Sequence, residues 1–254
     1  MRILGLIAGV LCWAGAAAAE PDPRLVEDLV TANRVLADLG VVDGFGHVSA
    51  RHDKDPNRYV MARSLAPALV KAEDILEYDL DSNAIDAKGR ALFLERFIHG
   101  EIYKARPDVK AVVHCHSPTL IPFGATTAKL QPVYHMSSFL GVGVPVFEIR
   151  DVAGPGSDML VRNGAIGAAL AKVLADKPVA LMRGHGAVVA GNSIPQVVFR
   201  AYYSEMNARL QAEAMRLGTV TYLTAEEAQA SARTNDGVLL RAWELWKRKA
   251  MKTE

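Results

Sequence analysis

The sequence predicts an α/β protein in which helices flank a sheet. Several segments carry apolar residues at the spacing of one helix face, and several others are short apolar runs typical of strands. These segments follow one another without the regular strand–helix–strand alternation of a doubly wound fold. Because half of the 254 residues are hydrophobic, the chain has enough apolar side chains for the core of one large domain.

In the first half of the chain, the expected elements end at residues that break regular structure. Leucines and valines at helical spacing stop before Gly40, and a later helical pattern stops at Arg106-Pro107. A stretch rich in Gly, Asp and Asn contains two short β-like runs and predicts a hairpin. The elements expected here are a helix over 25–39, strands over 48–51 and 59–62, a helix over 95–105 and a strand over 109–116.

The second half predicts two strands followed by two long helices. Thr224 caps the final helix, and acidic residues occupy its first turn, where the helix dipole favours them. The elements expected here are strands over 145–150 and 180–190 and helices over 194–217 and 225–249.

The first nineteen residues have the pattern of a secretory signal peptide. Arg2 is followed by an apolar run from Ile3 to Trp13, and small residues precede Glu20. The alternative is an uncleaved membrane anchor, but the apolar run is shorter than the roughly 20 residues that span a bilayer. We therefore expect a signal peptide over 1–19, a domain over 20–254, an exported, periplasmic or secreted location, and no stable membrane insertion after cleavage.

Charge and cysteine content exclude two further classes of protein. With 29 basic and 28 acidic residues and no basic block, the chain lacks the positive surface expected of a nucleic-acid binder. With two cysteines it cannot hold a disulfide framework. We expect a small-molecule substrate and no nucleic-acid partner.

Three histidines are candidate metal ligands. His114 and His116 end an apolar strand, so alternation places both imidazoles on one face and Cys115 on the other. His185 lies between two glycines, which leave room for an ion or a substrate to approach. The alternatives are surface or hydrogen-bonded core histidines and a tight turn that happens to carry a histidine. Together, three imidazoles would leave open positions on Zn, Mn, Fe or Co.

Glu95 is a candidate for the same site. It begins a helix that runs directly into the strand of His114 and His116, so its carboxylate is expected over the face of the two histidines. There it would complete the metal shell or act as an acid or base. The alternative is a first-turn glutamate favoured only by the helix dipole. His99, one turn later on the same face, is interpreted as a hydrogen-bonded core histidine.

Several motifs occur together in a characteristic order. They are Glu95-x-x-x-His99, Arg106-Pro107-Asp108-Val109, the run from Ala111 to Pro118 with its two histidines, and Gly184-His185-Gly186. From about Leu25 to about Tyr222 the chain thereby resembles the class II aldolase/adducin domain family. The resemblance implies a three-layer α/β/α sandwich with a central, largely antiparallel sheet, and a homotetramer with active sites between subunits. It also implies one divalent metal ion per subunit, held by His114, His116 and His185, with Glu95 as a further ligand or as the acid/base residue.

The sequence departs from the sugar-phosphate aldolases of that family. Phe93-Leu94 stands where those enzymes carry two serines before the glutamate, and His47 replaces an asparagine after Gly46. A phosphate needs several hydrogen-bond donors, so we expect a non-phosphorylated substrate. The replacements resemble the branch of the family that decarboxylates aromatic carboxylates bearing an adjacent hydroxyl.

Further residues are assigned to the substrate on the same basis. His47 is expected near the leaving group as a proton donor or polar orienting group. Arginines can hold a carboxylate through two parallel hydrogen bonds, although each is also a candidate for an ordinary ion pair. The predicted substrate-binding residues are Gly46, Ser49, Arg51, Arg63, Ser64 and Arg96.

The predicted function is that of a divalent-metal-dependent carbon–carbon lyase. The resemblance to the decarboxylating branch places decarboxylation ahead of retro-aldol cleavage, and both reactions fit one site because both need a metal to stabilise a carbanion or enolate. The alternatives are a sugar or sugar-phosphate aldolase or epimerase, a non-haem iron oxygenase on the same fold, and a non-catalytic adducin-like binding module. The last is disfavoured, since a scaffold has no need of three histidines and a glutamate in this arrangement.

Overall fold

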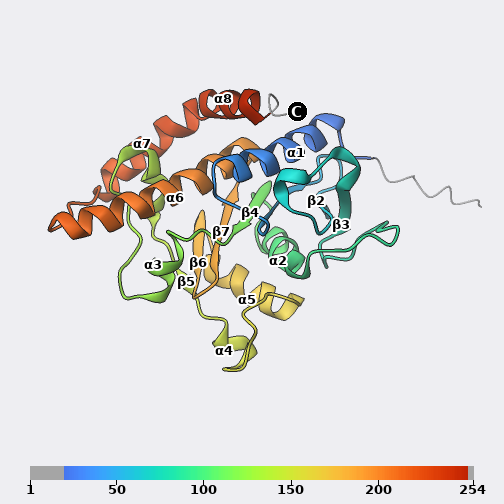
Figure 1. Cartoon of the computed structure of the whole chain (residues 1–254), viewed down its shortest axis with the longest axis horizontal. Coiled ribbons are helices and arrows are strands. Elements are labelled where there is room, and N and C mark those ends of the chain that lie inside the picture. Colours follow the sequence, from blue (N-terminus) through green and yellow to red (C-terminus); the bar gives the residue numbers. More distant parts are fainter. Residues whose placement is uncertain (1–19, 251–254) are drawn as a thin grey trace, which may run out of the picture.

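The computed structural model describes residues 20–250, in which a seven-stranded sheet lies between two layers of helices (Figure 1). The strand order is β3-β2-β1-β4-β7-β6-β5, and every neighbouring pair is antiparallel except β5 and β6. The strands are β1 (His47–Arg51), β2 (Arg58–Ala62), β3 (Ile75–Asp79), β4 (Ala111–Cys115), β5 (Val146–Phe147), β6 (Val179–Met182) and β7 (Gly186–Gly191). The expected signal peptide over 1–19 lies outside the described residues.

The helices form one layer on each face of the sheet. One layer contains α1 (Pro23–Asp38), α6 (Ile194–Leu217) and α8 (Leu240–Ala250), and the other contains α2 (Phe97–Ala105) and α5 (Gly164–Leu174). The remaining helices and turns are α3 (Ile121–Ala125), α4 (Arg150–Ala153), α7 (Ala225–Val238), η1 (Pro67–Leu69), η2 (Ala72–Asp74), η3 (Leu94–Arg96) and η4 (His135–Val142). The predicted α/β/α sandwich with a largely antiparallel sheet is confirmed.

Alternate residues of the central strands fill two separate cores. On β4, Val113 and Cys115 pack with α1 and α6, whereas Val112 packs with α2 and α5. Since side chains alternate along a strand, His114 shares the face of Val112 and lies on the α2 side. The prediction that Cys115 points away from the two histidines is confirmed.

Two regions were predicted as single elements and are each divided. The stretch 180–190 is a hairpin of β6 and β7, because Gly184 adopts a φ of +64° in the turn between them. The stretch 225–249 contains α7 and α8, which are separated at Leu239. An apolar or helical pattern shows burial, but it does not show where the chain reverses direction.

The remaining predicted strand, over 145–150, was too long. Its regular part is the two-residue β5, and the chain then enters the short helix α4. Strand β3 and helix α5 were not predicted, although β3 forms one edge of the sheet and α5 packs on α2.

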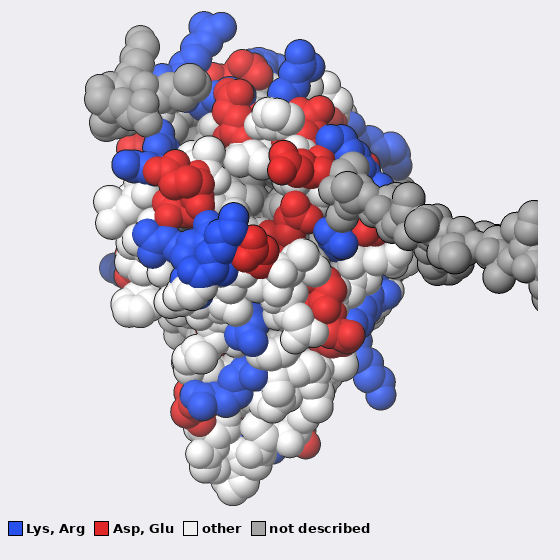
Figure 2. Space-filling view, turned by 90° about the vertical axis from the view of Figure 1, so that its right-hand side faces the viewer, with Lys and Arg blue, Asp and Glu red and all other residues white. Residues whose placement is uncertain are grey.

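The surface in Figure 2 carries basic and acidic side chains close together. In its upper part the two signs alternate, and its lower part carries fewer charges. Among residues 20–250, no helix combines the length and apolar character needed to cross a membrane.

Candidate metal centre

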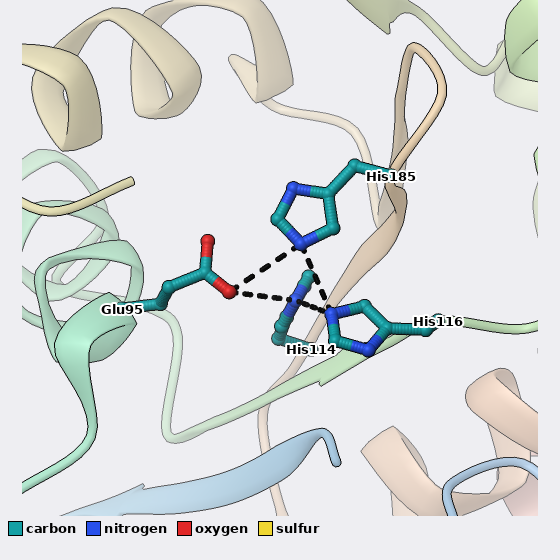
Figure 3. A group of neighbouring side chains, drawn as sticks. All are labelled: Glu95, His114, His116 and His185. Carbon is teal, nitrogen blue, oxygen red and sulfur yellow. Dashed lines mark hydrogen bonds and ion pairs between the residues drawn. The ribbon is translucent and has the colours of Figure 1, made fainter. Parts of the chain in front are cut away.

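Four side chains from three segments of the chain converge on one point (Figure 3). His114 and His116 lie at the end of β4, His185 lies in the β6–β7 turn, and Glu95 lies in η3. One ligand atom from each residue lies within 4.8 Å of the others. The structure therefore brings together the four residues that the sequence singled out as metal ligands.

His114 is oriented by the neighbouring strand. Its Nδ1 lies 3.1 Å from the carbonyl oxygen of Ala187 on β7, and a carbonyl can only accept, so the proton is on Nδ1. The Nε2 atom consequently keeps its lone pair and lies 3.0 Å from Nε2 of His116. A histidine whose second nitrogen donates to a carbonyl is the usual arrangement for a metal ligand.

His185 reaches the cluster because the start of β7 lies directly against the end of β4. A Cβ atom at Gly186 would stand 2.0 Å from the carbonyl oxygen of Cys115, so only glycine fits there. The glycine was expected to leave space for an ion or substrate, but the space it leaves is taken by the β4 backbone. This contact places His185 Nε2 3.0 Å from His116 Nε2.

Glu95 is fixed by a loop distant in sequence. The backbone N–H of Val161 donates to Oε1 over 2.9 Å, which leaves Oε2 at 3.5 Å from His114 Nε2 and 3.4 Å from His185 Nε2. Burial by itself opposes ionisation, but the nearby His114 and His185 outweigh it and hold the pKa of Glu95 well below its usual value. The carboxylate therefore faces the imidazoles as an anion.

The chemistry of this donor set fits a divalent metal ion. His116 Nε2 lies 3.0 Å from two other Nε2 atoms, and one nitrogen cannot make both contacts good hydrogen bonds with a single proton. Burial, followed by the nearby His114 and His185, lowers the pKa of His116 to about 4, so this ring is neutral at pH 7. Neutral imidazoles and a carboxylate are ligands that zinc and related metals accept.

His47 lies beside the cluster on β1. Its ring centroid is 5.1 Å from that of His114 and 4.7 Å from that of Phe93. Burial, followed by the neighbouring His99 and His114, lowers its pKa well below the ordinary histidine value. Gly46 immediately before it has a φ of +91°, and an added Cβ would stand 2.7 Å from Cγ1 of Val42, so the start of β1 requires glycine.

Arg51 and Arg96, two of the predicted substrate ligands, make their hydrogen bonds to backbone carbonyl oxygens of the fold. Arg51 donates to the carbonyl oxygens of Pro56, Tyr103, Arg106 and Val109, which satisfies its guanidinium within the fold. Arg96 donates to the carbonyl oxygens of Ser82 and Phe93 and lies over the ring of Phe97. Both arginines organise loops, and we do not retain them as substrate ligands.

The other predicted substrate ligands differ in their access to the site. Ser49 is fully buried, and its hydroxyl contacts His99 and Tyr103 instead of an open surface. Arg63 pairs with Asp74 over 2.6 Å, and Ser64 beside it is exposed. The register of β1 on β2 places Arg63 and Ser64 just beyond the strand residues that face Ser49, at the same end of the sheet as His47.

The sequence did not predict three groups at the site. The N–H of Val161 and the carbonyl of Ala187 are backbone atoms, and no side-chain pattern points to them. Phe45 was also missed; it is 70% exposed and its ring centroid lies 6.3 Å from that of His116. An exposed aromatic side chain beside a histidine cluster has no signature in sequence, because exposure depends on the final fold.

The sequence matches the family model for the class II aldolase and adducin N-terminal domain over residues 27–212. The match covers most of the chain and includes all four residues of the cluster. This protein therefore belongs to the class II aldolase and adducin family, in which it is similar to enzymes that include decarboxylases and aldolases.

Two decarboxylases are among its most similar curated relatives. Decarboxylase tropJ of Talaromyces stipitatus is 33% identical over 246 residues, which cover 88% of this chain and 92% of that protein. A 3,4-dihydroxyphthalate decarboxylase of Arthrobacter keyseri is 31% identical over 207 residues, covering 76% and 79% of the two chains. Among solved structures, an L-fuculose 1-phosphate aldolase from Glaciozyma antarctica has a TM-score of 0.76 at 21% identity and covers 91% of this chain and 89% of its own.

The predicted exported, periplasmic or secreted location is wrong. The two curated relatives are described as decarboxylases, with no mention of export, and none of the comparisons supports an exported location. The prediction rested on composition alone, because a short apolar run followed by small residues has the make-up of a leader without showing that it acts as one.

Proposed function

We propose that this protein is a divalent-metal-dependent carbon–carbon lyase that decarboxylates a non-phosphorylated, aromatic hydroxy carboxylate. The observation that carries the proposal is the convergence of three imidazole nitrogens and one carboxylate within 4.8 Å, beside His47. The similarity to two decarboxylases over most of the chain supports the reaction class. We take the domain to span residues 20–254.

In this proposal, His114, His116 and His185 hold the metal through Nε2, and Glu95 is the fourth ligand through Oε2. The contact from Val161 to Oε1 keeps the carboxylate turned toward the histidines. When bound, the ion supplies a Lewis acid that stabilises negative charge on the substrate as the carbon–carbon bond breaks. The site accepts Zn, Mn, Fe or Co on ligand type alone.

Apolar side chains around the cluster favour a flat aromatic substrate. Phe45 is 70% exposed and Leu94 is 56% exposed, and Phe93 packs on His47. Such surfaces bind an aromatic ring by contact area and offer no donor to a phosphate. We retain Gly46, Arg63 and Ser64 as substrate-binding residues, since they lie at this end of the sheet. His47 faces the substrate as a donor near the leaving group.

We also propose that the active protein is a homo-oligomer, with a tetramer as the expected state. The exposure of Phe45, close to His116, and of Leu94, next to Glu95 in the chain, supports the idea, because large exposed apolar groups favour further burial. Size-exclusion chromatography with light scattering of the purified chain measures the assembly, and a monomer at micromolar concentration would contradict this part of the proposal.

The proposed function is tested by metal analysis and a product assay on the full chain. We expect about one divalent ion per chain, and CO2 release from 3,4-dihydroxyphthalate or a related ortho-hydroxy aromatic carboxylate, equal with and without O2. Treatment with a chelator should abolish the release, and adding back one of the four metals should restore it. Cleavage of L-fuculose 1-phosphate without CO2 release would favour an aldolase, and turnover that requires O2 would favour an oxygenase.

A further inference from the structure

A chain of four buried polar side chains leads away from the metal centre. His47 Nδ1 lies 2.7 Å from His99 Nε2, and His99 Nδ1 lies 2.6 Å from the hydroxyl of Ser49. The Ser49 hydroxyl in turn lies 2.8 Å from that of Tyr103. His99, Ser49 and Tyr103 have no exposed surface, and His47 is 4% exposed.

We propose that Tyr103, Ser49 and His99 are positioning residues that hold His47 in the tautomer protonated on Nε2. The site then presents a neutral hydrogen-bond donor, rather than an acceptor, to an oxygen of the substrate. The catalytic meaning of this inference rests on the proposed function, whereas the tautomer itself is a property of the chain alone.

The direction of the hydrogen bonds is set at the Tyr103 end. A buried hydroxyl that has an acceptor within reach donates its proton to it, since leaving a buried donor unsatisfied is costly. Within the described residues, the Ser49 oxygen is the acceptor left to Tyr103.

The remaining bonds follow one by one. Because Ser49 accepts from Tyr103, its own proton is available to His99 Nδ1, which is therefore an acceptor. A neutral His99 then carries its proton on Nε2 and donates it to Nδ1 of His47. A neutral His47 must consequently carry its proton on Nε2, an atom that makes no hydrogen bond within residues 20–250.

The reverse direction would require His47 to donate to His99, His99 to Ser49, and Ser49 to Tyr103. The Tyr103 proton would then lack an acceptor in a fully buried position, which the fold disfavours. The same chain explains why Ser49 has no access to the substrate: its hydroxyl connects two buried rings.

The test compares two tyrosine variants in the full-length chain. Tyr103→Phe removes the donor that sets the direction, so Ser49 becomes free to accept from His99 and the chain can reverse. Tyr78→Phe is the matched control, because Tyr78 is equally buried in the same core and its hydroxyl has no partner among the described residues. Nitrogen-15 NMR of labelled histidines at pH 7.5, without substrate, reports the tautomer of His47 and His99.

The wild-type chain and Tyr78→Phe should show His47 protonated on Nε2, and Tyr103→Phe should show a mixture or the Nδ1 form. With an active substrate, we expect kcat of Tyr103→Phe to fall about tenfold or more while KM changes less than about twofold. If Tyr103→Phe does not fold, Ser49→Ala breaks the same chain at its middle.

An Nδ1-protonated His47 in the wild-type protein, or tautomers unchanged in the folded Tyr103→Phe or Ser49→Ala variant, would overturn the inference. If no tested carboxylate releases CO2 while the NMR result is as expected, the proposed function fails and the positioning chain stands.

Discussion

At the scale of single residues, the candidate metal centre depends on which lone pairs are free. The Ala187 carbonyl accepts a hydrogen bond from Nδ1 of His114, and the Val161 N–H donates one to Oε1 of Glu95. Residue types and strand alternation were enough to nominate the ligands. The tautomers and the free carboxylate oxygen could not be predicted, because they depend on backbone atoms that are distant in sequence.

Replacing a single ligand should remove the metal without unfolding the protein. Changes to residues that hydrogen-bond to a metal ligand typically lower metal affinity by roughly 10- to 100-fold. His185→Ala removes a ligand itself, so we expect a larger loss of metal affinity. Inductively coupled plasma mass spectrometry of the purified variant gives the metal content. His135→Ala is the control, since His135 is an exposed histidine on η4 outside the cluster. Equal metal content in the two variants would contradict the ligand assignment.

At the scale of elements, the β6–β7 hairpin carries one ligand and sets its distance from the other two. Its turn places His185 opposite His116, and Gly186 allows β7 to lie against β4. The sequence showed the two glycines but not their roles, because a Gly-His-Gly motif fits a turn and a ligand loop equally well. The hairpin is where the single-strand interpretation failed and where the site is built.

Gly186→Ala tests that close approach. Its added methyl would overlap the Cys115 carbonyl, so we expect the free energy of unfolding to fall by about 2 kcal/mol or more, together with loss of metal. Gly237→Ala is the matched control: it lies in helix α7 with no atom within 4 Å of the added carbon, and we expect no loss, or a gain of about 0.5–1 kcal/mol. Urea unfolding of both variants measures the difference, and an equally stable Gly186→Ala would show that the strands can separate at little cost.

At the scale of the whole molecule, the fold keeps several histidines neutral inside it. Burial, followed by the nearby His114 and partly offset by Glu95, lowers the pKa of His99 to about 3, far below the ordinary value near 6.5. The folded state therefore binds fewer protons than the unfolded state between these two values. Stability from this group is fully present above about pH 6.5 and is lost as the pH falls toward 3.

In chelator-treated protein, His99 alone should lower the free energy of unfolding by about 2 kcal/mol between pH 7.5 and pH 5, since each pH unit below 6.5 costs about 1.4 kcal/mol. Urea unfolding at the two pH values measures this change. His99→Gln should flatten the dependence by about that amount, whereas His135→Gln at an exposed position should keep the wild-type slope. An unchanged slope in His99→Gln would show that His99 is not held neutral by the fold.

The sequence by itself determined the family, the sandwich architecture and the four residues of the candidate metal centre. Helix and strand periodicity predicted helices flanking a sheet, and the spacing of His114 and His116 with the glycines beside His185 indicated the ligands. The family and the sandwich were implied by the resemblance that the ordered motifs carry. Only the tertiary structure shows that Arg51, Arg96 and Ser49 make their hydrogen bonds inside the fold, and that Val161 and Ala187 contact Glu95 and His114. The physical reason is that hydrogen-bond direction and burial depend on which segments meet, and those segments lie up to 73 residues apart in the chain.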